Sequence, residues 1–170
     1  MNTLLDAIRA CIHVGQPTKL SGGGESNIYV ELRPALLHHR SSGYILRALE
    51  DTIPGTIANV AGPILSGALI VAGLVVAGRI PRGLVIRAEQ KKHGTMSLVT
   101  GPATKTGEAV WLVDDVATTY DSLWITAHNL EKERGLRVAG ATVIVSRDPA
   151  AASKLWFPCG HLFTLKGLLP

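Results

Sequence analysis

The stretch Trp111–Ser122, WLVDDVATTYDS, passes from an apolar run to two acids and then to a cluster of hydroxyl residues. Val110–Val113 has the length and composition of a short buried strand, and the pattern after Ser122 is that of a helix. We therefore expect Asp114–Asp121 to form the turn between them. A strand-to-helix turn lies at the carboxyl end of a sheet, where free backbone N–H groups and the helix dipole favour anionic ligands. The stretch thus predicts an anion-binding site.

The composition is that of a compact soluble protein with much buried sheet. The chain has 170 residues, of which 46% are hydrophobic, and we expect one domain over residues 1–170. The net charge is +4, and no run of like charges indicates a nucleic-acid-binding tail. Mild basicity of this kind also suits a phosphorylated small molecule as the partner.

Location is predicted from the cysteines and from the apolar segments. Cys11 and Cys159 have neither metal-ligand spacing nor the density of a disulfide framework, so we expect free thiols in a reducing cytoplasm. The start, MNTLLDAIRA, is charged where a secretory signal would be apolar. The apolar run Ile64–Ala77 has about fourteen residues, short of the roughly 20 that a membrane span needs, so a buried helix is the preferred interpretation.

Strand and helix patterns alternate along the chain and predict an α/β fold with a largely parallel sheet and helices on both faces. The expected helices are Thr3–Ile12, Ser41–Glu50 with Tyr44 on its buried face, a small-residue helix from the turn Gly62–Gly67 to about Ala77, and Ser122–Arg134 with Gly135 as its stop. The expected strands are Asn27–Leu32, Thr56–Ala61, Leu84–Ile86, Val110–Val113 and Val138–Val145. Arg33, at a strand end, is either a ligand contact or a solvated side chain.

The interval Arg87–Gly101 is long and polar for a strand connection. It carries several cations, Arg87, Lys91, Lys92 and His93, against a single acid. Such a loop is either a lid or binding loop, or a solvated loop without function. Its departure from the same sheet edge as the acids favours a lid. A cationic lid opposite an acidic, hydroxyl-rich turn suits a substrate with phosphate groups at one end and sugar hydroxyls at the other.

Several segments, in order along the chain, resemble the orotate phosphoribosyltransferases, a branch of the type I phosphoribosyltransferases. WLVDDVATT resembles the family signature of a strand, two acids and a phosphate loop. The other matching segments are SGGGESNIYVELR, RAEQKKHG, AGATVIVSRD and LFTLKGLL. The resemblance implies a mainly parallel twisted sheet with a mobile lid loop and a small N-terminal hood. It also implies a reaction in which orotate attacks C1 of phosphoribosyl pyrophosphate (PRPP), releasing pyrophosphate and forming orotidine 5′-monophosphate.

The resemblance further implies roles for individual residues. Asp114 and Asp115 would accept hydrogen bonds from the ribose hydroxyls, and the lid residues would neutralise pyrophosphate. The implied catalytic residues are Lys91, His93, Asp114 and Asp115; the implied substrate-binding residues are Arg87 and Lys92 at pyrophosphate, Thr118, Thr119 and Ser122 at the 5′-phosphate, and Arg147 and Tyr29 at the base. Mg²⁺ would arrive with pyrophosphate, held by substrate and water oxygens. The lid of this family commonly serves the neighbouring subunit, which implies a homodimer.

The phosphate loop departs from the family pattern T-T-G-G-S at Tyr120 and Asp121. Glycine permits a positive φ there, where a tyrosine would be strained. Asp121 also adds a negative charge beside the expected phosphate. Ser66 and Ala88 stand where some relatives have lysines. Two alternatives therefore stay open: a non-catalytic ligand-sensing or regulatory relative, and a transferase for another base.

Overall fold

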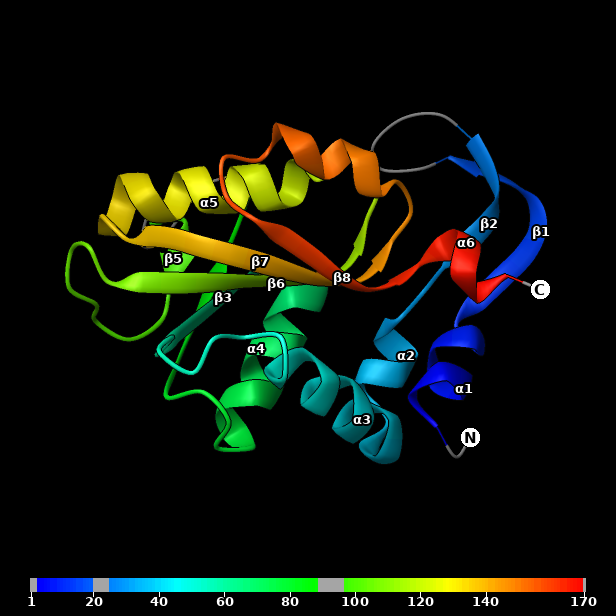
Figure 1. The fold of residues 1–170 in the computed structure, drawn as a ribbon, viewed down its shortest axis with the longest axis horizontal. Coiled ribbons are helices and arrows are strands. Elements are labelled where there is room, and N and C mark those ends of the chain that lie inside the picture. Colours follow the sequence, from blue (N-terminus) through cyan, green and yellow to red (C-terminus); the bar gives the residue numbers. More distant parts are fainter. Residues whose placement is uncertain (1–2, 20–24, 89–96, 170) are drawn as a thin grey trace.

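A mainly parallel sheet forms the centre of the molecule (Figure 1). The computed structural model describes residues 3–19, 25–88 and 97–169. Within these residues the sheet has six strands in the order β5-β4-β3-β6-β7-β8. Their bounds are β3 Asn59–Pro63, β4 Arg82–Ile86, β5 Val99–Thr100, β6 Ala109–Ala117, β7 Arg137–Ser146 and β8 Cys159–Thr164. The strands pair in parallel except β5, which runs antiparallel to β4. The predicted α/β fold is confirmed.

Helices cover both faces of the sheet (Figure 1). One face carries α1 Leu4–Arg9, α2 Arg33–Leu36, α3 His39–Glu50 and α4 Ser66–Val76, and the other carries α5 Asp121–Arg134 and the 3₁₀ helix η1 Pro149–Lys154. The short helix α6 Leu165–Leu168 follows β8. In β6, Val113 packs into the core with α3 and α4 while Leu112 packs into the core with α5. This is the alternation that a strand imposes on successive side chains.

A two-stranded antiparallel hairpin, β1 Ile12–Lys19 and β2 Glu25–Val30, lies beside the end of the sheet (Figure 1). We refer to this hairpin as the hood. The helix predicted over Thr3–Ile12 ends at Arg9, because Ile12 pairs with Val30 in the hood. Sequence periodicity cannot show pairing with a distant strand. The strand predicted over Asn27–Leu32 begins and ends two residues earlier than expected.

The structure corrects the predicted burial of Tyr44 and the predicted bounds of the strand over Thr56–Ala61, and it confirms the buried helix predicted after that strand. Tyr44 is 38% exposed rather than buried, because α3 turns a narrower face, with Ile45 and Leu49, toward the core. The strand predicted over Thr56–Ala61 lies at Asn59–Pro63. The apolar segment after it forms α4, and among the described helices none is long and apolar enough to cross a membrane.

The crossing from β3 to α4 brings backbone unusually close to backbone. A Cβ atom on Gly62 would lie 2.7 Å from the carbonyl oxygen of Val113 and 2.9 Å from atoms of Gly67. The absence of a side chain at Gly62 therefore lets the start of α4 sit against the ends of β3 and β6. The Ile64–Leu65 peptide bond in this crossing is cis.

Candidate active site

The two adjacent acids lie inside β6 and not in a turn, so the predicted turn Asp114–Asp121 is wrong at its first half. β6 keeps its pairing with β7 as far as Ala117 opposite Ser146. The connection to α5 is thus only Thr118–Tyr120. The apolar run in the sequence ends before the backbone pairing does, because strand pairing depends on the neighbouring strand and not on side-chain polarity. Alternation then sends the two acids in different directions.

Asp114 is a buried acid beneath the start of α5. It is 6% exposed. Its Oδ2 accepts a hydrogen bond of 2.9 Å from the Ser122 hydroxyl, and its Oδ1 accepts one of 2.9 Å from the Asp115 N–H. Burial, and after it the charge of Asp115, raises the pKa of Asp114 well above its usual range. Ser122, at the beginning of α5, is thereby fixed to β6.

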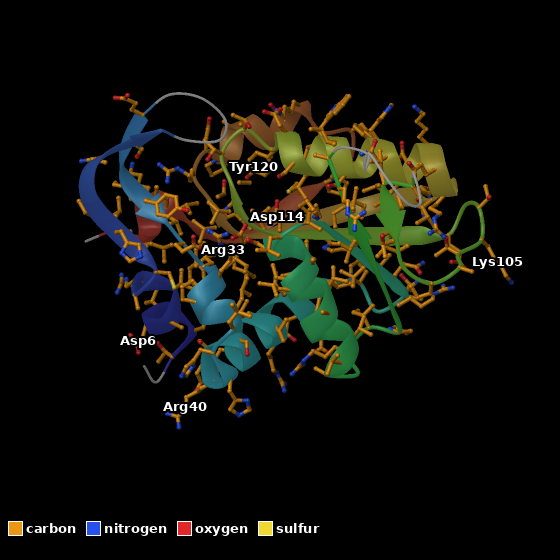
Figure 2. The ribbon with its side chains drawn as sticks, turned by 180° about the vertical axis from the view of Figure 1, so that it is seen from behind. Asp6, Arg33, Arg40, Lys105, Asp114 and Tyr120 are labelled. Carbon is orange, nitrogen blue, oxygen red and sulfur yellow. The ribbon has the colours of Figure 1, made fainter. Side chains whose placement is uncertain are left out.

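Asp115 faces a cavity of about 230 Å³ between the hood and the ends of the central strands. We call this the hood cavity. It is lined by Tyr29, Val30, Glu31, Arg33, Ser66, Asp115, Val116, Thr118 and Arg147. Figure 2 shows Arg33, Asp114 and Tyr120 toward the hood side of the molecule and Lys105 at the opposite end. Among the predicted site residues, Asp115, Thr118, Arg147 and Tyr29 thus come together around one space.

A charged network of Tyr29, Glu31 and Arg33 stands on the hood side of this cavity, and of its members only Glu31 was not anticipated from the sequence. Arg33 forms an ion pair with Glu31, and the Tyr29 hydroxyl donates to Glu31 Oε2 at 3.1 Å. Hydrogen bonding from Arg33 lowers the pKa of Glu31 to about 2, so Glu31 is ionised at neutral pH. The alternation of a strand could not have revealed this network, because Tyr29 lies in β2 whereas Arg33 is the first residue of α2.

Arg147 joins the end of β7 to the hood. Its Nη1 donates to the Ile28 carbonyl at 3.0 Å and its Nη2 to the Ser26 hydroxyl at 2.8 Å. Its backbone N–H donates to the Ala117 carbonyl at 2.8 Å. Burial lowers the pKa of Arg147, although a guanidinium stays charged at any physiological pH. Arg147 therefore fixes β2 over the cavity into which Asp115 faces.

The connection Thr118–Tyr120 and the start of α5 border a second cavity of about 400 Å³. We call Thr118–Ser122 the phosphate loop and this space the loop cavity. No described residue accepts a hydrogen bond from the backbone N–H groups of Thr118, Thr119 or Tyr120. Free N–H groups at a helix N-terminus make a site for an anion such as phosphate. The anion site predicted for this stretch has the required backbone donors.

Tyr120 adopts the conformation that was expected to need glycine. Its φ is 59° and its ψ 15°, in the left-handed region. The side chain is 2% exposed, and its hydroxyl shares a hydrogen bond of 2.7 Å with the hydroxyl of Ser146. Left-handed backbone disfavours a residue with a Cβ by about 1–2 kcal/mol. Burial of the aromatic ring of Tyr120 offsets this conformational cost, so the loop keeps the left-handed backbone conformation without a glycine.

Asp121, the other departure from the family pattern, does not stand as an isolated charge. Its Oδ2 accepts a hydrogen bond of 2.6 Å from the Thr119 hydroxyl, and its Oδ1 pairs with Lys154 of η1. The hydrogen bond from Lys154, followed by the one from Thr119, lowers the pKa of Asp121. Lys154 and Asp121 are 33 positions apart in the chain, so no local sequence pattern connects Lys154 with the loop.

Arg87 directly follows β4 and borders a third space, of about 330 Å³, with Pro63, Ile64, Ala88, Ser122, Ile125 and Thr126. Its N–H donates to the Leu98 carbonyl at 3.0 Å, and its own carbonyl accepts from Asn129 Nδ2 at 3.4 Å. The remaining predicted lid residues, Lys91, Lys92 and His93, lie outside the described residues. Their predicted roles therefore stay predictions.

The fold, with the acids and the loop that it positions, defines the class of protein. A mainly parallel sheet with paired acids in β6, a loop with free backbone N–H groups before α5 and a hood is a type I phosphoribosyltransferase. Solved structures agree. Orotate phosphoribosyltransferase from Aeropyrum pernix matches with a TM-score of 0.82 and 28% identity, over 98% of this chain and 96% of that chain. The Mycobacterium tuberculosis H37Rv orotate phosphoribosyltransferase in complex with PRPP matches with a TM-score of 0.75 and 26% identity, over 98% and 89%.

Sequence comparison gives the particular family. The orotate phosphoribosyltransferase of Mycobacterium tuberculosis (strain ATCC 25618 / H37Rv) is 33% identical over 154 residues, which are 89% of this chain and 85% of the relative. No protein-family model matches the chain. The chain belongs to the orotate phosphoribosyltransferases, enzymes that transfer a phosphoribosyl group from PRPP to orotate in pyrimidine nucleotide biosynthesis. The resemblance noted in the sequence is confirmed.

Proposed function

We propose that this chain forms orotidine 5′-monophosphate where the hood cavity meets the loop cavity. The observation that carries the proposal is that Val116 and Thr118 line both cavities, so the two spaces adjoin at the end of β6. PRPP would place its 5′-phosphate in the loop cavity and its ribose at the junction. Orotate would occupy the hood cavity, and its ring nitrogen would attack C1 as the bond to pyrophosphate breaks.

The two acids of β6 would act on the ribose. The transition state has the character of an oxocarbenium ion, which nearby carboxylates stabilise when they are already in place. Asp115 lines the hood cavity next to Val116, one of the two residues that line both cavities. Asp114 accepts a hydrogen bond from the Ser122 hydroxyl, and a ribose hydroxyl is a donor of the same kind that could take over this bond. We therefore assign both acids to the ribose, as the family resemblance implied.

The two ends of PRPP would meet donors of different kinds. The backbone N–H groups of the phosphate loop, with the hydroxyls of Thr118, Thr119 and Ser122, would hold the 5′-phosphate. Arg87 would meet pyrophosphate, because its cavity shares Ala88, Ser122 and Ile125 with the loop cavity. Lys91, Lys92 and His93 would complete this end when the lid closes and excludes water.

The base would lie between the hood and Arg147. Arg147 borders the hood cavity with Tyr29 and Arg33, and orotate carries a carboxylate that suits a cationic wall. Glu31 supports this side by holding both Tyr29 and Arg33 through its ionised carboxylate. We assign Arg147 and Tyr29 to the base, with Glu31 as the residue that positions Tyr29.

Mg²⁺, a second subunit and a cytoplasmic location complete the proposal. Mg²⁺ would arrive with pyrophosphate and would be held mainly by the oxygens of the substrate and of water, which are the hard ligands that suit this ion. Bound to pyrophosphate, the ion would neutralise charge on this leaving group.

A homodimer would bring each lid to the neighbouring subunit. Cys11 and Cys159 are free thiols in the structure, which is consistent with a reducing cytoplasm.

Loss of orotate absorbance in the presence of PRPP and Mg²⁺ tests the proposal directly. The wild-type protein should turn over. Asp115→Asn should lower kcat by about 100-fold, because it removes a preorganised charge at the developing cation. Asp51→Asn, an exposed acid after α3, is the matched control and should leave kcat unchanged.

Each negative result has a distinct meaning. Absence of turnover together with absence of PRPP binding by calorimetry would refute the enzyme proposal and favour the regulatory alternative. PRPP binding without turnover of orotate, but with turnover of another base, would favour the alternative transferase.

A further inference from the structure

Lys154 and Asp121 form an ion pair at the mouth of the phosphate loop. Lys154 is the last residue of η1, and Asp121 is the first residue of α5. The Asp121 carboxylate accepts from two donors at once, Lys154 through Oδ1 and the Thr119 hydroxyl through Oδ2 at 2.6 Å. One of these donors, Thr119, is already assigned to the substrate phosphate under the proposed function. Asp121 therefore occupies donors that an incoming phosphate would use.

We propose that Lys154 is a ligand of the 5′-phosphate of PRPP, and that Asp121 holds its ammonium group beside the loop until the phosphate binds. The inference rests on the proposed function and adds Lys154 to the residues that would hold the 5′-phosphate. In the unliganded protein the carboxylate serves as an internal substitute for the phosphate. On binding, Thr119 and Lys154 exchange the carboxylate for phosphate oxygens.

The exposure of the pair makes this exchange easy. The side chain of Lys154 is 38% exposed and that of Asp121 is 61% exposed, so neither charge is trapped in the interior. An exposed ion pair contributes little to the free energy of unfolding, so breaking it costs little. A phosphate group carries more charge than a carboxylate and offers more acceptor oxygens. The ammonium group thus gains by moving from Asp121 toward the phosphate.

The backbone of η1 is held firmly enough to present Lys154. Trp156, two residues further on, contacts Trp124 of α5 edge to face with ring centroids 6.1 Å apart. Its indole N–H donates to Glu131 Oε1 at 3.3 Å. The adjacent Phe157 is 7% exposed and belongs to the core shared with α5. These contacts attach η1 to the helix whose N-terminus begins at Asp121, so only the lysine side chain has to move.

The alternative role for Lys154 is to neutralise Asp121 without touching substrate. Both roles predict weaker PRPP binding when Lys154 is removed alone, because either leaves Asp121 repelling the phosphate. They differ when Asp121 is neutral. A ligand still contributes to binding in that background, whereas a neutralising partner has nothing left to neutralise. A double-mutant cycle therefore separates the two roles.

The experiment measures calorimetric affinity for ribose 5-phosphate and for PRPP with Mg²⁺ in the wild type, Lys154→Gln, Asp121→Asn and the double variant. Lys154→Gln should weaken both affinities about tenfold in either background, as expected for a charge-assisted hydrogen bond. Asp121→Asn alone should strengthen them about threefold by removing a like charge. Lys154→Arg should retain most of the affinity. KM for orotate should stay unchanged in all variants, because the pair is at the phosphate end.

Lys105→Gln, at the opposite end of the molecule (Figure 2), controls for the change in net charge and should leave the affinities unchanged. Thermal unfolding of each variant confirms that it is folded. Equal affinities of Asp121→Asn and the double variant would overturn the inference while leaving the proposed function intact. A wild-type protein that bound no PRPP would overturn the proposed function, and the inference with it.

Discussion

At the scale of single residues, Tyr120 shows that a backbone conformation can be kept when glycine is lost. The residue combines a φ of 59° with a buried ring and a hydroxyl bound to Ser146. Ser146 precedes Arg147, which holds the hood through Ser26 and Ile28. Tyr120 therefore ties the phosphate loop to the strand end that positions the base side of the site.

Substitution of Tyr120 tests this account. Tyr120→Phe should lower the free energy of unfolding by about 1 kcal/mol through loss of the hydrogen bond to Ser146. Tyr120→Gly should lower it by about 3 kcal/mol, because the lost ring outweighs the relief of backbone strain. Neither should tighten PRPP binding, since the loop already follows the course that glycine permits. Denaturant unfolding and calorimetry provide the measurements, and a glycine variant that was more stable than the wild type would contradict this account.

Asp114 should make the unliganded protein less stable as pH rises. Its pKa is raised in the folded state above its ordinary value of 3.8, first by burial and then by Asp115. The folded protein thus holds this proton more tightly than the unfolded chain. The resulting stability is fully present below the unfolded pKa and is lost as pH rises through the folded pKa.

Asp114→Asn removes this titration and allows a direct measurement. The melting temperature of the variant, relative to the wild type, should be higher at pH 8 than at pH 5. Orotate turnover should fall, because Asp114 accepts hydrogen bonds through both of its carboxyl oxygens and the amide of asparagine has only one acceptor oxygen. Asp51→Asn, at an exposed position, is the control for replacing an aspartate by asparagine. A constant offset between wild type and Asp114→Asn across the pH range would mean that Asp114 is ionised throughout.

At the scale of elements, the site depends on how closely α4 approaches the strands. Gly62→Ala would put a Cβ 2.7 Å from the Val113 carbonyl oxygen, on the strand residue just before Asp114. We expect a loss of about 1–3 kcal/mol in the free energy of unfolding from this overpacking, with lower turnover because β6 must shift.

Gly43→Ala is the matched control, because nothing lies within 4 Å of a Cβ at this position in α3. It should be neutral or stabilising by up to about 1 kcal/mol, the difference in helix propensity. Urea denaturation of both variants measures the contrast. Equal stability of the two variants would show that the crossing from β3 to α4 tolerates a side chain.

At the scale of the whole molecule, the proposed homodimer can be tested by complementation. Lys91→Ala damages the lid, and Asp115→Asn damages the ribose site. If each lid serves the neighbouring subunit, a mixed dimer of the two variants contains one intact site. Co-expressed variants should then recover about a quarter of wild-type activity, since half of randomly formed dimers are mixed and half of their sites are intact.

The two variants purified separately and assayed together without subunit exchange are the control, and should be nearly inactive. Activity that stayed at this level after co-expression, with mixed dimers demonstrated by differently tagged subunits, would show that each lid serves its own subunit. Sedimentation of the wild-type protein at the mass of one 18.0 kDa chain would exclude the dimer itself.

The sequence by itself determined the parallel sheet, the family and the succession of strands and helices from the residues after Gly55 to Ser146, except for β5. This short antiparallel strand lies in the interval Arg87–Gly101, which was predicted to be a loop. Local apolar patterns and glycine stops set these features, as at α5, which ends at Arg134 and is followed by Gly135 with a φ of 61°. Motifs predicted the paired acids and the phosphate loop because their residues are adjacent in the chain. The lid residues Lys91, Lys92 and His93 were predicted in the same way, and they lie outside the described residues.

Only the tertiary structure decided how the acids and the loop are held. The extension of β6 through Asp114 and Asp115 depends on β7, and the hood depends on pairing between Ile12 and Val30. The bonds from Tyr120 to Ser146 and from Asp121 to Lys154 join residues 26 and 33 positions apart. Hydrogen bonds and burial between such distant residues leave no local pattern, because they arise only when the folded backbone brings the elements together.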